Sequence, residues 1–136
     1  MDKKNNMVGI VVVCHNRKLA RELINFSREM QHAEFGIENG GGTGTDSYGT
    51  NPEIIIEAVR EADRGGGVLI FVDLGSAIMS TEIALEMLNG EIEARIADVP
   101  LIEGLISAVA GNFQGVTLDE LEKTAMESKS YSKLAL

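Results

Sequence analysis

The chain alternates short apolar runs with longer segments whose apolar residues recur at helical spacing. The runs VGIVVV at 8–13 and VLIFV at 68–72 are continuously apolar and rich in β-branched residues. This pattern is typical of parallel strands that are covered on both faces. Apolar and polar residues alternate at 34–38 and 92–96, which predicts two half-exposed strands. Helical spacing predicts helices at 18–32, 52–62, 76–88, 100–113 and 117–129.

Strands that alternate with helices predict an α/β fold, a three-layer sandwich with a mainly parallel sheet. Right-handed crossovers, with the two fully apolar strands at the centre, favour the strand order 2-1-3-4. A chain of 136 residues fits a single domain, and we expect a core at about 7–127 with frayed ends. The helix at 100–113 has little polar face, so it is either deeply buried or shared with a second subunit.

Charge and cysteine content narrow the classes of function. The chain has 12 Lys and Arg against 21 Asp and Glu, a formal charge of −9, and its basic residues are scattered. Nucleic-acid binding is therefore excluded, because phosphates attract concentrated basic residues. The single cysteine, Cys14, suits a reducing compartment. The apolar run after Lys3 and Lys4 is short and lacks a cleavage pattern, so we expect a cytoplasmic protein without membrane insertion.

Two residues able to do chemistry follow the central strands. His15 lies just past the first strand, and Asp73 ends the third. In the order 2-1-3-4 these strands are neighbours, and their following helices leave toward opposite faces. The crevice beyond their carboxyl ends is the topological switch point, where doubly wound folds bind ligands. His15 and Asp73 are therefore predicted to face each other across this crevice.

This pair suits phosphoryl transfer. A neutral imidazole attacks phosphorus through one ring nitrogen while a carboxylate holds the proton on the other. The backbone N–H groups of 16–18, at the start of a helix, would favour a bound phosphate. A covalent phosphohistidine needs no cofactor, and we expect no metal site. The structural alternative is that His15 caps the helix or bonds a loop.

Three other features of the chain bear on its chemistry. Cys14 and His15 are adjacent on an extended segment and point to opposite faces, so Cys14 is expected in the core rather than as a nucleophile. His32, near a helix end, is expected to have a surface role. The loop NGGGTGTDSYGTN at 39–51 has neither GxxxxGK[ST] nor GxGxxG, which leaves ATP and NAD binding unsupported. Its hydroxyls either close over a phosphate or belong to a solvated loop; they are Thr43, Thr45, Ser47 and Thr50.

Four motifs together resemble a known family. They are GIVVVCHN at 9–16, GTN at 49–51, DLGSA at 73–77 and PLIEG at 100–104. The chain from 7 to about 125 resembles the phosphocarrier subunits of phosphotransferase-system-dependent dihydroxyacetone kinases, which are relatives of the mannose-type IIA domains.

The resemblance implies a homodimeric cytoplasmic protein that accepts a phosphoryl group from the carrier protein HPr onto His15. It would pass the group to ADP held on the nucleotide subunit of the kinase, in phosphoenolpyruvate-dependent phosphorylation of dihydroxyacetone. Asp73 would orient His15. The residues implied to lie beside the phosphate are Asn16, Thr50, Gly75 and Ser76. Family members often have Ser where this chain has Asn16, which puts the detailed phosphate contacts in question.

Three alternatives remain. A mannose-type IIA domain would use the same histidine chemistry to feed a sugar permease IIB domain, but that group typically has a WGGSP-like turn where this chain has LGSA at 74–77. A response-regulator receiver has the same strand order, but its magnesium-binding acidic pair is replaced here by 14–16. The third alternative is a non-catalytic regulatory or ligand-binding module in which His15 is never modified.

Overall fold

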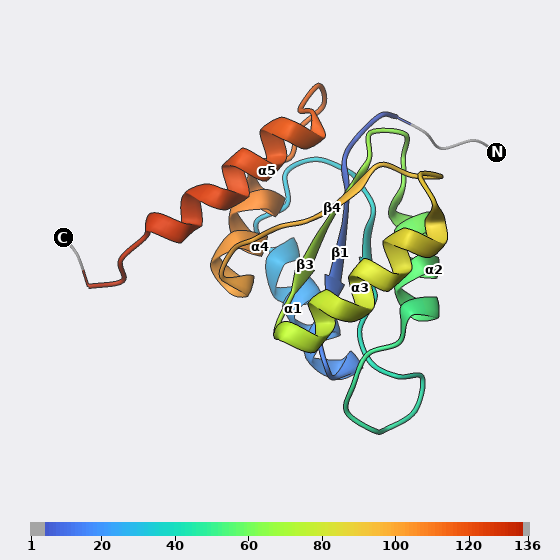
Figure 1. The fold of residues 1–136 in the computed structure, drawn as a ribbon. Coiled ribbons are helices and arrows are strands. Elements are labelled where there is room, and N and C mark those ends of the chain that lie inside the picture. Colours follow the sequence, from blue (N-terminus) through green and yellow to red (C-terminus); the bar gives the residue numbers. More distant parts are fainter. Residues whose placement is uncertain (1–4, 135–136) are drawn as a thin grey trace.

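Four parallel strands form the centre of the computed structural model, which describes residues 5–134. The sheet has the order β2-β1-β3-β4 (Figure 1). Its strands are β1 (Gly9–Val13), β2 (Ile37–Asn39), β3 (Val68–Val72) and β4 (Ala94–Ile96). The predicted fold class and strand order are confirmed.

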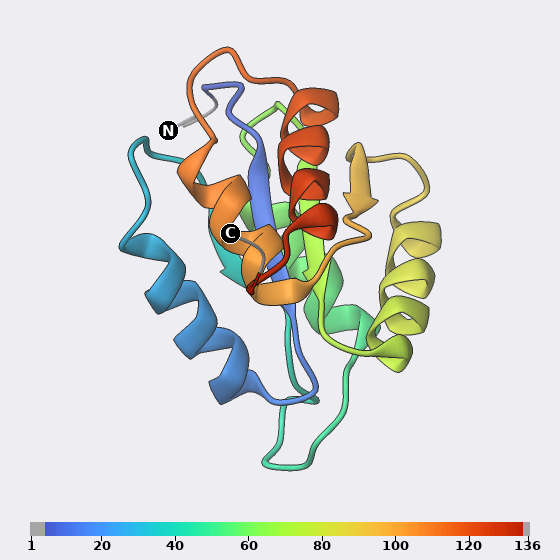
Figure 2. The ribbon, with the colours of Figure 1, turned by 90° about the vertical axis from the view of Figure 1, so that its left-hand side faces the viewer.

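Helices cover both faces of this sheet. On one face lie α1 (Arg17–Arg28), α4 (Leu101–Ala110) and α5 (Leu118–Met126), which stand in front of the strands in Figure 2. On the other lie α2 (Pro52–Ala62) and α3 (Gly75–Leu88). A 3-10 turn, η1 (Glu127–Ser130), continues from α5. None of the helices between residues 5 and 134 is both long and apolar enough to cross a bilayer.

Burial on both faces explains the continuous apolar runs of the central strands. Every residue of β1 is buried. Ile10 and Val12 pack in the core under α1, α4 and α5, whereas Val11 and Val13 pack under α2 and α3. Successive side chains of a strand point to opposite faces, so a strand that is covered twice needs apolar residues at every position.

The predicted starts of α2 and α5 are confirmed by their caps. The side chain of Asn51 accepts a hydrogen bond from the Glu53 N–H at 2.9 Å, and Pro52 occupies the first turn. At α5, Thr117 and Glu120 form a reciprocal capping box. These caps satisfy N–H groups that have no partner within the helix.

Several element boundaries differ from the predictions. The sequence predicts the second strand at 34–38, but β2 is Ile37–Asn39. Phe35 and Ile37 are both buried, which explains the apolar pattern, but the pairing with β1 begins only at Ile37. The fourth strand begins at Ala94 rather than 92, and the first helix ends at Arg28 rather than 32. After Arg28 the N–H groups of residues 29–31 donate to carbonyls three residues back instead of four, so the α-helix ends there.

The apolar helix predicted at 100–113 is α4, and it is shorter at both ends. Its inner side, with Leu105, Ala108 and Val109, is buried against the sheet and α5. Ile102 is half exposed, so the helix is buried on one side only. The expected fraying of the chain ends falls partly on residues 1–4 and 135–136, which lie outside the described residues.

Gly9 provides a test of how closely β1 and α2 pack. A Cβ at Gly9 would lie 2.2 Å from the carbonyl oxygen of Ala62, too close for any atom. We expect Gly9→Ala to lower the free energy of unfolding by about 3 kcal/mol through overpacking. Gly75→Ala is the control, because a Cβ at Gly75 meets nothing within 4 Å. Urea titrations of both variants measure the difference, and equal stabilities would contradict the proposed contact.

Candidate functional site

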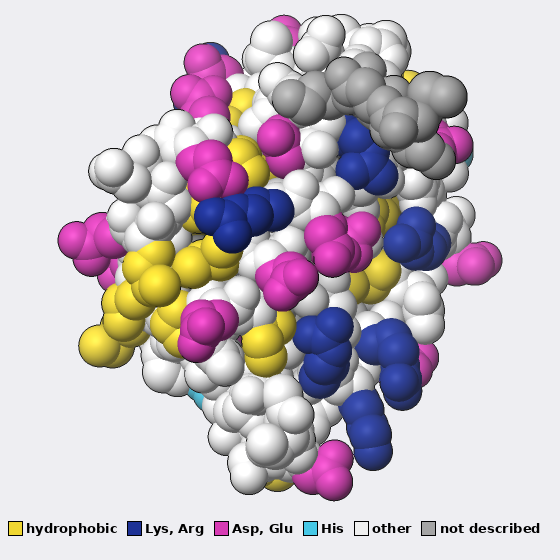
Figure 3. Space-filling view, turned by 90° about the vertical axis from the view of Figure 1, so that its right-hand side faces the viewer, with side chains coloured by type: hydrophobic (Ala, Val, Ile, Leu, Met, Phe, Trp, Pro, Cys, Tyr) yellow, Lys and Arg dark blue, Asp and Glu magenta, His cyan; other side chains and the backbone are white. Residues whose placement is uncertain are grey.

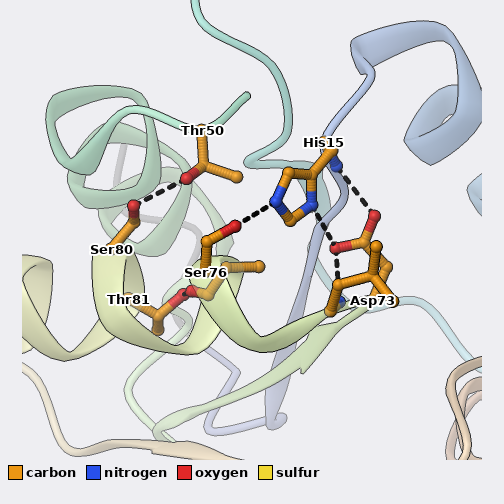
Figure 4. Close-up of polar contacts among 8 residues, drawn as sticks. His15, Thr50, Asp73, Ser76, Ser80 and Thr81 are labelled. Atoms are coloured by element: carbon orange, nitrogen blue, oxygen red, sulfur yellow. Dashed lines mark hydrogen bonds and ion pairs between the residues drawn. The ribbon is translucent and has the colours of Figure 1, made fainter. Parts of the chain in front are cut away.

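The structure brings His15 and Asp73 together at the carboxyl ends of β1 and β3. Val13 and Val72 pair in register at the end of the ladder, so the residues that follow them leave the sheet side by side. The backbone N–H of His15 donates to Asp73 Oδ2 at 2.9 Å, and His15 Nδ1 lies 2.8 Å from Asp73 Oδ1 (Figure 4). The carboxylate thus contacts both the backbone and the ring of the histidine.

This contact determines which ring nitrogen of His15 is available. Asp73 Oδ1 also accepts the N–H of Leu74 at 2.7 Å, so the carboxylate takes three N–H groups. A carboxylate only accepts hydrogen bonds, which assigns the imidazole proton to Nδ1 and leaves the lone pair on Nε2. The side chains of His15 and Asp73 are 24% and 13% exposed. The imidazole is therefore oriented and still accessible.

Nε2 points toward the start of α3. There the hydroxyl of Ser76 donates a hydrogen bond to it. Leu74 is the N-cap of α3 and makes no side-chain capping bond, so the first N–H groups of this helix are not satisfied by a cap. A helix N-terminus with free N–H groups favours an anion. The absence of any atom within 4 Å of a Cβ at Gly75 means that space remains beside this turn.

Two other predicted site residues, Asn16 and Thr50, use their side chains differently. The Oδ1 of Asn16 accepts the N–H of Leu19 at 2.9 Å, so Asn16 is the N-cap of α1. The hydroxyl of Thr50 bonds the hydroxyl of Ser80 on α3, with 2.6 Å between the oxygens. Asn16 thus caps α1 through Leu19, whereas α3 has no side-chain cap.

The glycine-rich loop is attached to the site only at its base. Gly42 donates its N–H to the carbonyl of Cys14 at 3.0 Å, and Gly49 donates to the carbonyl of His15 at 2.7 Å. At the exposed tip, Thr43, Thr45 and Ser47 hydrogen-bond within the loop. At the other end of the loop, the structure brings Thr50 beside His15 (Figure 4).

Ser80 was not identified from the sequence. Its signal was available, because a residue four positions after Ser76 lies on the same face of a helix. What the sequence could not provide was the partner, since Thr50 reaches Ser80 through the long loop.

The remaining candidates have structural roles. Cys14 is fully buried, and burial, with a smaller contribution from Asp73, raises the pKa of its thiol to about 12. A thiol that stays protonated is a poor nucleophile. His32 stacks on Phe113, with ring centroids 6.1 Å apart.

The surface around the site carries a hydrophobic patch and a separate basic patch. Figure 3 shows hydrophobic side chains gathered on the left, where α3 lies, and Lys and Arg side chains gathered on the lower right, at the start of α1. The exposed hydrophobic residues of α3 and its N-cap are Leu74, Ile78, Met79, Ile83 and Met87. The basic residues in the first half of α1 are Arg17, Lys18 and Arg21.

Comparison with known proteins identifies the family of this chain. Residues 9–124 match the family model EIIA-man, described as the PTS system fructose IIA component. The chain belongs to the EIIA-man family. A solved structure described as the unknown function protein EF1359 is 28% identical, covers 93% of this chain and 100% of its own, and superposes with a TM-score of 0.76. A sigma-54 interaction domain protein from Enterococcus faecalis, 17% identical with a TM-score of 0.65, shares the fold.

Curated relatives carry the names that the sequence motifs suggested. The phosphoryl donor subunit DhaM of PEP-dependent dihydroxyacetone kinase 2 from Listeria innocua is 38% identical over 75% of this chain and 83% of its own length. The phosphotransferase subunit DhaM of the PTS-dependent dihydroxyacetone kinase from Lactococcus lactis is 34% identical, over 88% and 97%. The Escherichia coli DhaM is 31% identical, but the match spans 27% of that longer protein. The resemblance drawn from the sequence is confirmed.

The buried thiol predicts a pH dependence of stability. The unfolded thiol loses its proton near its ordinary pKa of 9.0, whereas the native thiol keeps it to about 12. Between these values the native state binds more protons, so the free energy of unfolding falls as pH rises, by up to about 1.4 kcal/mol per pH unit from this group. We expect Cys14→Ala to remove this part of the slope in urea titrations at pH 8, 9 and 10. Identical slopes for both proteins would contradict it.

Proposed function

We propose that this chain is a phosphohistidine carrier, which takes a phosphoryl group onto Nε2 of His15 and passes it to a second protein. The observation that carries the proposal is the contact between His15 Nδ1 and Asp73, because it holds the ring with Nε2 directed to the start of α3. Membership of a phosphotransferase-system family supports the same chemistry.

In the accepting step, the lone pair of Nε2 attacks the phosphorus of the donor's phosphohistidine. A bond forms between Nε2 and phosphorus while the bond from phosphorus to the donor nitrogen breaks, and the donor imidazole leaves with the electron pair. The proton on Nδ1 stays in its hydrogen bond, and Asp73 offsets the positive charge that develops on the ring. The Ser76 hydroxyl rotates away from Nε2 and, with the N–H groups at the start of α3, donates to the phosphoryl oxygens.

We assign HPr as the donor and ADP bound to the nucleotide subunit of a dihydroxyacetone kinase as the acceptor. The names of the DhaM relatives, a phosphoryl donor subunit and a phosphotransferase subunit, support this assignment. The exposed hydrophobic side chains of α3 and the basic residues of α1 flank the site. These two patches suit contacts with the donor and acceptor proteins. In this proposal the protein acts in the cytoplasm as a homodimer and uses no metal or cofactor besides the covalent phosphohistidine.

A second acceptor is favoured by the description of the family model, which names a IIA component of a sugar system. The phosphorylated protein would then transfer its phosphate to a IIB domain. Incubating the phosphorylated chain with an ADP-loaded kinase subunit and, separately, with a IIB domain distinguishes the two acceptors. We expect rapid loss of phosphate to the ADP-loaded subunit, with formation of ATP.

His15→Ala is expected to abolish phosphorylation without unfolding the protein, because His15 is partly exposed and makes its contacts at the edge of the sheet. The assay uses phosphoenolpyruvate, enzyme I and HPr, and measures an acid-labile phosphate on the chain. His32→Ala is the matched control and should be labelled as the wild type is. A phosphate that persists in His15→Ala would show that another residue is the nucleophile.

Asp73→Asn is expected to retain the fold and slow phosphorylation by roughly 10²-fold to 10⁴-fold, since an amide can donate to Nδ1 and stabilise the wrong tautomer. The rate is measured by rapid quench with the same donor. Asp46→Asn removes a carboxylate from the exposed loop and should have the wild-type rate. Equal rates for Asp73→Asn and the wild type would remove Asp73 from the mechanism.

A further inference from the structure

We propose that Ser80 is a positioning residue for the phosphohistidine, acting by holding Thr50 against the Nε2 side of His15. This inference rests on the proposed function and adds to it a residue that does not touch the histidine. The hydrogen bond that the structure gives the Ser80 side chain is to Thr50, with 2.6 Å between the two oxygens.

The register of α3 creates this arrangement. Ser76 and Ser80 are one helical turn apart, so both hydroxyls lie on the same face of α3. The first contacts Nε2 directly, and the second contacts Thr50. Figure 4 shows Ser76 and Thr50 both on the Nε2 side of the ring, with the Thr50 hydroxyl turned away from the ring toward Ser80. One helix therefore organises both neighbours of the reacting nitrogen.

The backbone of the loop fixes where Thr50 begins but not where its side chain points. Gly49 bonds the His15 carbonyl, and Thr50 itself forms an isolated parallel bridge with Gly42. Gly49 has φ of +141°, a conformation that other residues rarely adopt, which fits this close return of the loop. These contacts bring the Thr50 backbone beside the end of β1. The hydroxyl of Ser80 then selects the rotamer of Thr50.

The consequence concerns the space that a phosphoryl group on Nε2 would occupy. With Thr50 held by Ser80, that space is bounded by the start of α3 on one side and by the Thr50 side chain on the other. Without Ser80 the Thr50 side chain can turn into the space, and the productive geometry is held for less of the time. Loss of one such hydrogen bond corresponds to roughly a fivefold slower transfer.

The test uses a small donor, so that it does not depend on the identity of the partner proteins. Phosphoramidate phosphorylates imidazoles: a bond from Nε2 to phosphorus forms, the phosphorus–nitrogen bond of the donor breaks, and ammonia leaves. Phosphorylation of the full chain is followed by ³¹P NMR at several phosphoramidate concentrations. We expect Ser80→Ala to react roughly fivefold more slowly than the wild type, with a free energy of unfolding lowered by no more than about 1 kcal/mol, the contribution of the lost hydrogen bond.

Thr81→Val is the matched control, because it removes the next hydroxyl of α3, which bonds the Ala77 carbonyl rather than Thr50. It should react at the wild-type rate, and Ser80→Thr, which keeps the hydroxyl, should restore at least half of that rate. Because Ser80 acts through Thr50, adding Ser80→Ala to Thr50→Val should slow the reaction no further. A purely structural effect would instead multiply in the double variant.

Each contrary outcome is decisive. A wild-type rate in Ser80→Ala, equal slowing in Thr81→Val, no recovery in Ser80→Thr, or multiplied effects in the double variant would each overturn the role of Ser80 while leaving the carrier function intact. A wild-type protein that takes no phosphate on His15, from either phosphoramidate or phosphorylated HPr, would overturn the carrier function and the role of Ser80 with it.

Discussion

The carboxylate of Asp73 holds the site together by accepting three N–H groups. It bonds the backbone and the ring of His15 and the backbone of Leu74, and so it joins the residues that follow β1 to those that follow β3. One side chain thereby fixes the position of the histidine, its rotamer and its tautomer. Hydrogen bonds to a charged acceptor are roughly twice as strong as neutral ones, which suits the role proposed for Asp73 of holding the ring while its charge changes.

The position of the Asp73 carboxylate beside His15 is set by the pairing of β1 with β3. The ladder between β1 and β3 ends at Val13 and Val72, and the N–H of Asp73 continues it to the Val13 carbonyl at 3.2 Å. The side chains of these strands pack into cores on both faces, so a one-residue slip would move each of them to the opposite face and disrupt both cores. The helices that follow leave toward opposite faces, which opens the crevice between them. The rigid core thus provides the preorganised placement that the proposed phosphoryl transfer would require.

The parts of the site that could be predicted are those that follow from strand ends. Continuous apolar runs identified β1 and β3. The residues directly after such strands meet at one edge of a parallel sheet, which predicted His15 and Asp73 as site residues. Asn16 illustrates the limit, because the same residue can cap a helix or contact a ligand, and here its side chain is used by the Leu19 N–H. Ser80 shows another limit, since its partner depends on the return path of a long loop that has no periodicity to read.

The groups around Nε2 bear on how the proposed carrier would release its phosphoryl group. Arg17, the basic residue nearest to His15 in the chain, directs its guanidinium to the carbonyls of Asn39 and Gly41 at 3.2 Å each. On the Nε2 side the structure places the hydroxyl of Ser76 and the side chain of Thr50. Hydroxyl and amide donors hold phosphate less strongly than a bidentate guanidinium does. The proposed carrier would need this weaker hold, because it has to release the phosphoryl group as well as accept it.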